Sequence, residues 1–75
     1  MDRAMIEEHL AQAERHVALG EHHIALQRER VAKLGRDGHD FTQASVLLTN
    51  FEELQAIYVA DRDRLEGKLA DLPPY

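Results

Sequence analysis

A seven-residue repeat of apolar and polar positions runs through the first half of the chain, from Ala4 to Gly38. Each of its five units opens with alanine. The first four units close on an apolar residue, and these residues are Leu10, Val17, Ile24 and Val31. A strict seven-residue period predicts a helix that packs one stripe of side chains against a partner helix over several turns.

The first helix is expected from about residue 3 to residue 34. A second row of positions completes its core stripe: Ile6, Ala13, Gly20, Gln27 and Leu34. Acidic residues lie near the start of this segment and basic residues near its end, which matches the helix dipole. Pattern and charge therefore predict the same helix.

A break between Gly35 and Asp40 separates this helix from a second one, expected at about residues 41–70. Its two glycines can end a helix in the left-handed backbone region. Asp40 is then a good N-cap, with Gln43 completing a capping box. Residues 71–75, with two consecutive prolines, are expected to form an extended tail. This tail could alternatively be a docking peptide for another protein.

Two long helices joined by a short turn must lie antiparallel, so the sequence predicts an all-α, coiled-coil-like two-helix hairpin. Centring the turn at His39 aligns the two stripes. The resulting pairs include Gly20 with Tyr58, Ala13 with Leu65, Val17 with Asp61, Gln27 with Phe51 and Leu34 with Ala44. Several of them set a small side chain against a large one, as close packing requires.

The hairpin leaves several apolar residues beside or outside the two stripes. They are Leu19, Leu26, Val46, Leu48, Ile57, Val59 and Leu69. A chain of 75 residues without cysteine has a thin core and no disulfide to reinforce it. We therefore expect a homodimer in which two hairpins form a four-helix bundle.

The composition narrows the class of function. The net charge of −5 disfavours non-specific binding to nucleic acid or to an anionic membrane. The sequence has no apolar run as long as a membrane span and no basic-apolar leader. We therefore expect a soluble cytoplasmic protein without a nucleic-acid or membrane partner.

The histidines His9, His16 and His23 form a row along one edge of the first helix. Residues seven apart on a helix are separated by ~10.5 Å, so these side chains cannot share one metal ion without ligands from elsewhere. The simplest interpretation is that they are amphipathic residues at the edge of the seam. Metal binding with help from the second helix, or pH sensing, are the alternatives.

Asp61 occupies a stripe position where an apolar residue is expected, and His16 is its nearest plausible partner. We interpret Asp61 as a polar residue that fixes the register, and Gln27 and Tyr58 as structural residues too. Glu14 and Arg62 lie on the same edge and are expected to pair between the helices. An Asp–His pair without a nucleophile or an oxyanion hole is not an active site.

Three stretches resemble a family of short bacterial helical proteins: HLAQAERHVALGEHHIALQRE at residues 9–29, GHD at residues 38–40, and FEELQ with ADRDRL at residues 51–65. No activity, cofactor or catalytic residue is known for that family. The resemblance implies a bacterial source and carries no role over to any residue.

The sequence thus favours a non-enzymatic module for protein–protein interaction and oligomerisation, with no cofactor. Its partner is a second copy or another protein bound on a helical face. The alternative is a bundle that binds a small molecule or a metal through polar interior residues, for which His16, His23, Tyr58 and Asp61 are the candidates.

Overall fold

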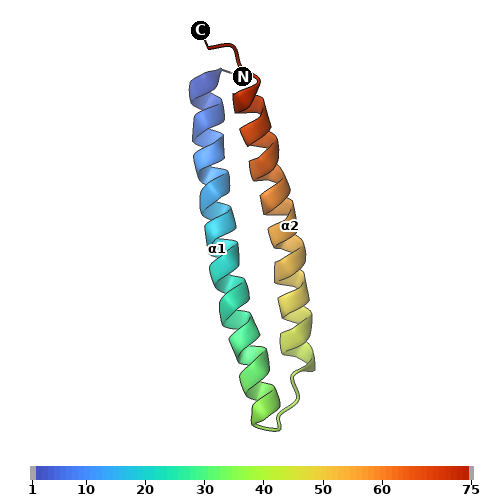
Figure 1. Ribbon diagram of the computed structural model, residues 1–75. Coiled ribbons are helices and arrows are strands. Elements are labelled where there is room, and N and C mark those ends of the chain that lie inside the picture. The colour runs from blue at the N-terminus through green and yellow to red at the C-terminus, as the bar shows by residue number, and fades with distance from the viewer. Residues whose placement is uncertain (1, 75) are drawn as a thin grey trace.

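The computed structural model describes residues 2–74 and shows two long antiparallel helices (Figure 1). Helix α1 spans Arg3–Arg36 and helix α2 spans Thr42–Ala70. The backbone measures 60 × 14 × 13 Å, so the hairpin is a rod only two helices thick. The predicted all-α hairpin is confirmed.

Capping interactions fix both ends of α1. The Asp2 carboxylate accepts a hydrogen bond from the Met5 N–H at 2.8 Å and caps the first turn. At the other end Gly38 has a φ of +75°, the left-handed conformation that glycine adopts readily. The N–H groups of His39 and Gly38 bond back to the carbonyls of Leu34 and Gly35, at 2.9 and 3.2 Å. This pattern is a Schellman cap, so glycine ends the helix as predicted, two residues later than residue 34.

The start of α2 differs from the prediction. Phe41, rather than Asp40, occupies the N-cap position, and its side chain makes no capping bond, so the predicted capping box is absent. The Asp40 carboxylate still accepts the Thr42 N–H at 2.9 Å. At the far end the helix stops at Ala70 as predicted, and the Arg3 guanidinium donates to the Pro73 carbonyl at 3.2 Å. Tyr75, the last residue of the suggested docking peptide, lies outside the described residues.

The predicted alignment of the two helices is wrong by about one helical turn. Gly20 lies against Gln55 instead of Tyr58, whose ring packs on His16. Phe51, predicted opposite Gln27, packs on His23. The loop explains the offset, because it runs back along α1 and brings Phe41 beside Gly35 (Figure 1). Helix α2 therefore begins level with an earlier part of α1 than a tight turn at His39 would allow.

The core is thin and rests mostly on α1. Its buried apolar residues are Ile6, Ala13, Val17, Ile24 and Leu65. Only the last of these belongs to α2 among the described residues. Leu47 and Leu54, predicted as core, are 39% and 44% exposed, whereas Leu48 and Leu69, predicted beside or outside the stripes, are half-buried. Helix α2 is therefore also rotated about its own axis relative to the predicted stripe. Much of the apolar surface of α2 thus remains accessible.

Neither helix in the described part of the chain is both long and apolar enough to cross a membrane.

Candidate functional site

Two adjoining hollows lie along one side of the hairpin, between α1 and α2. Their volumes are about 240 and 320 Å³, and they share His23 and Phe51. We call the surface that lines them the groove face. Its α1 residues are His16, Leu19, Gly20, His23, Leu26, Gln27 and Arg30. Its α2 residues are Leu47, Phe51, Leu54, Gln55 and Tyr58.

Two ring contacts across the helices form the middle of the groove face. The rings of His16 and Tyr58 have centroids 5.1 Å apart, and those of His23 and Phe51 are 6.1 Å apart. The structure therefore brings three of the four predicted candidates, His16, His23 and Tyr58, to one hollow. They line an open surface rather than an interior, because His23 is exposed and the other two are half-buried.

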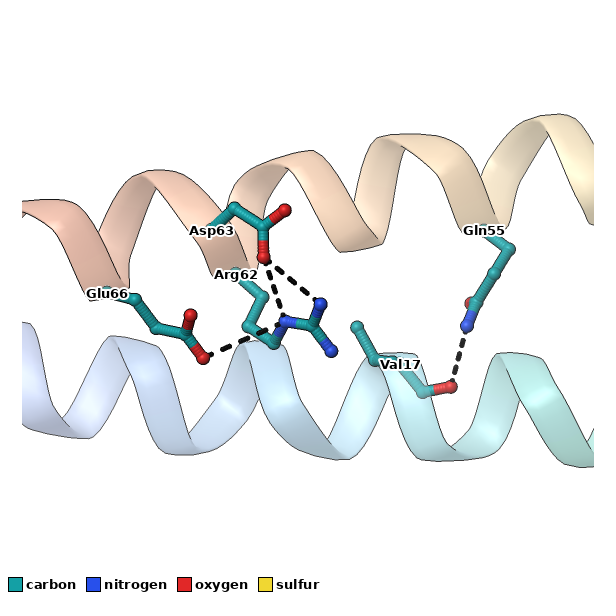
Figure 2. Close-up of polar contacts among 5 residues, drawn as sticks. All are labelled: Val17, Gln55, Arg62, Asp63 and Glu66. Carbon is teal, nitrogen blue, oxygen red and sulfur yellow. Dashed lines mark hydrogen bonds and ion pairs between the residues drawn. The ribbon is translucent and has the colours of Figure 1, made fainter.

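Two glutamines connect the helices beneath the groove. The Gln55 amide donates to the Val17 carbonyl at 2.9 Å, and the buried Gln27 amide donates to the Ala44 carbonyl at 2.9 Å (Figure 2 shows the first). Gly20 makes room for Gln55, since the Gln55 amide occupies the space of a Cβ at position 20. Each helix thus sends one side chain to the backbone of the other, which fixes their relative position along the axis.

Asp61, the fourth candidate, does not belong to the groove face. Its carboxylate pairs with Arg64 on the same helix at 2.6 Å, and its side chain is 45% exposed. The expectation of a buried Asp61 partnered by His16 is therefore wrong. It failed because α2 is rotated relative to the predicted stripe, so that the neighbouring Arg62 side chain, 31% exposed, is turned further toward α1 than Asp61.

The predicted pair between Glu14 and Arg62 is also corrected. Arg62 binds two carboxylates of its own helix, Asp63 at 3.1 Å and Glu66 at 3.8 Å (Figure 2). An ion pair between the helices forms elsewhere, between Arg28 and Glu52 at 3.2 Å. Both partners are largely exposed, so it contributes at most about 1 kcal/mol.

Charge is scarce on the groove face. Aspartate, glutamate, lysine and arginine make up 31% of the chain. Within the described part, Arg30 alone among the residues that line the hollows carries a formal charge. Depletion of charge around apolar and aromatic side chains is typical of the centre of a protein–protein interface.

The histidines do not gather into a metal centre in the described residues. Residues 2–74 contain no group of three histidine, aspartate or glutamate side chains placed to hold an ion. The closest two histidines are the neighbours His22 and His23, with ring centroids 6.0 Å apart. His9 is exposed and lies outside the groove face.

The sequence pattern identified part of this surface. Leu19 and Leu26 were recognised as apolar residues outside the stripes, and they are 55% and 50% exposed. Leu47 and Leu54 were missed because the heptad pattern assigned them to the core. Gln55 was also missed, although a glycine in the middle of α1 was a signal that some bulkier group had to fit there.

A search for similar proteins gives no match to this chain among protein-family models, curated proteins or solved structures.

Proposed function

We propose that the chain is a non-enzymatic interaction module that associates with a second copy of itself through the groove face. One observation carries the proposal: a charge-poor apolar surface covers one side of a hairpin whose own core is too thin. Four half-exposed leucines, Leu19, Leu26, Leu47 and Leu54, project around the rings of His23 and Phe51. Pairing two such faces gives a four-helix bundle.

The apolar contribution to association in such a dimer is of the same size as its cost. Complete burial of one leucine stabilises by about 1.5–3 kcal/mol, so half of that is about 1 kcal/mol. The four leucines of each copy then contribute about 8 kcal/mol in a dimer, before Phe51 and the histidine stems are counted. Association costs about 4–15 kcal/mol in lost freedom. The margin is small, so the dimer should dissociate on dilution.

Sedimentation from about 100 μM down to sub-micromolar protein, with helicity followed by circular dichroism, tests the proposal. Because the hairpin has few buried residues of its own, helicity should fall as the dimer dissociates. A monomer over the whole range with full helicity would overturn the proposal.

A matched pair of variants assigns the association to the groove face. Leu19→Gln combined with Leu54→Gln removes two half-exposed leucines per copy, which should weaken the dimer at least about 100-fold. Met5→Gln alters a side chain of similar exposure, 47%, outside the groove face. Its Kd should change less than about threefold. Equal effects of the two variants would show that the contact lies elsewhere.

A small-molecule or metal binder is the second candidate, supported by the convergence of His16, His23 and Tyr58 on one hollow. The same experiment separates it from the first. If a single hairpin binds the ligand in its open hollow, the protein would remain monomeric at about 100 μM, and added zinc or a small aromatic compound would shift the NMR signals of these three side chains. A dimer would bury the hollow and exclude such ligands.

A further inference from the structure

We infer that the two copies pack with their turns at opposite ends, about a two-fold axis perpendicular to the helices at the level of His23 and Phe51. This geometry rests on the proposed self-association and adds to it the orientation and the register of the partner. It follows from two independent features, the spacing of the exposed apolar residues and the distribution of charge.

The first feature is the self-complementarity of the leucines. A two-fold axis perpendicular to the rod reverses the direction of the helices in the second copy. A residue that lies a given distance above the axis in one copy therefore meets residues that lie the same distance below the axis in the other copy. Leu19 and Leu26 are seven residues apart, with their midpoint beside His23. Leu47 and Leu54 are also seven apart, with their midpoint beside Phe51.

The ring contact between His23 and Phe51 places these two midpoints at one level of the rod. A single axis at that level therefore maps both leucine pairs onto their counterparts in the second copy. Val46 and Ile57, 57% and 65% exposed, lie on either side of the same level. Leu19 of one copy then meets Leu26 of the other, and Leu47 meets Leu54.

The second feature is the charge of the two halves of the rod. Residues 23–50, the turn half, carry four basic and three acidic side chains, a net charge of +1. Residues 2–22 and 51–74, the terminal half, carry five basic and eleven acidic side chains, a net charge of −6. Turns at the same end would set two strongly acidic halves side by side. Turns at opposite ends set each acidic half beside the slightly basic half of the other copy, which is the favourable arrangement.

Disulfide trapping tests this orientation, because the chain has no cysteine of its own. Gln12, Leu19, Leu26 and Lys33 form one row on α1. In the inferred dimer Gln12 of one copy meets Lys33 of the other, whereas the two Gln12 residues are about 30 Å apart. When Gln12→Cys and Lys33→Cys proteins are mixed, the disulfide between the two variants should form at least about 10-fold faster than the disulfide between two copies of either variant. All samples contain the same redox buffer.

A control pair on the other side of α1 measures random collision. Glu14→Cys and Ala32→Cys have nearly the same spacing as the test pair and are equally exposed, but their row points away from the groove face. This mixture should show only the background rate. Background rates in the test pair, with a dimer present by sedimentation, would overturn the inferred interface while leaving self-association intact.

The remaining outcomes are also decisive. Disulfide formation that is faster with Gln12→Cys alone and with Lys33→Cys alone than with their mixture would bring equal positions of the two copies together and overturn the inferred orientation. A monomer by sedimentation, with all four variants at background, would overturn the proposed function itself. The two failures are therefore distinguishable.

Discussion

At the scale of single residues, substitutions at Gly20 and at Gln55 should have coupled effects on stability, because the Gln55 amide fills the space beside Gly20. A Cβ at position 20 would lie 2.6 Å from the Gln55 Cδ, so Gly20→Ala must displace the amide from Val17. Alanine gains about 1 kcal/mol of helix propensity, and losing the hydrogen bond offsets about 0.5–1.5 kcal/mol. Gly20→Ala should therefore be nearly neutral in the natural chain and stabilising by about 1 kcal/mol in a Gln55→Ala background. Urea unfolding of the natural chain, both single variants and the double variant at one protein concentration measures these free energies. If Gly20→Ala changed the free energy of unfolding equally in both backgrounds, the two residues would not be coupled.

Two other glycines give opposite expectations for the same substitution. Gly38 has a φ of +75°, so Gly38→Ala should destabilise the hairpin by about 1–2 kcal/mol. Gly67 lies inside α2, and a Cβ there meets no atom within 4 Å. Gly67→Ala should stabilise by up to about 1 kcal/mol. Thermal melting of both variants at matched concentration checks the signs, and a stabilised Gly38→Ala would exclude the Schellman cap.

At the scale of the helices, the start of α2 should be sensitive to acid, because the Asp40 carboxylate accepts the Thr42 N–H there. The backbone N–H of Thr42 is the main reason that the pKa of Asp40 lies below its ordinary value of 3.8. A carboxyl whose pKa is lower in the folded state stabilises that state above the unfolded-state pKa, and this contribution is lost as pH falls through the folded-state pKa. Asp40→Ala should thus be destabilising at neutral pH, and its stability should approach that of the natural chain as pH falls through the lowered pKa of Asp40.

Asp40→Asn is the control for this prediction, because it keeps an acceptor oxygen and removes the titration. Its difference in unfolding free energy from Asp40→Ala should stay constant with pH. If the natural chain also keeps a constant difference from Asp40→Ala down to low pH, the ionised carboxylate does not stabilise the helix start.

The heptad pattern predicted both helices almost to their ends, because apolar periodicity and glycine caps are local properties of the chain. It could not predict how far α2 is displaced along α1. That displacement depends on the path of the loop past Gly35 and on the bonds from Gln27 and Gln55 to the opposite backbone. Each bond joins a polar side chain of one helix to a backbone carbonyl of the other, and a pattern of side chains does not reveal such acceptors.

At the scale of the whole molecule, the rotation of α2 about its own axis decides which residues the surface presents. The predicted alignment buried Leu47 and Leu54, whereas the observed alignment places them around the hollows with Leu19 and Leu26. His16, His23 and Tyr58 were still grouped correctly, although Tyr58 was predicted in the stripe opposite Gly20 and packs instead on the ring of His16. Asp61 was not, because its place in the predicted site depended on its lying in the stripe that faces α1.

The charge of the whole rod leads to the last prediction, which concerns salt. Two copies with a net charge of −5 each repel one another overall, but turns at opposite ends place the −6 half of each copy beside the +1 half of the other. The repulsion between the two acidic halves and the attraction between unlike halves then nearly cancel, and salt screens both. Raising the ionic strength from about 0.05 to 0.5 M, which shortens the Debye length from ~14 to ~4 Å, should change the dimer Kd less than about threefold. Sedimentation at several salt concentrations measures this. A dimer that tightens more than about tenfold with salt would instead have its acidic halves side by side, since only that packing has strong repulsion for the salt to screen.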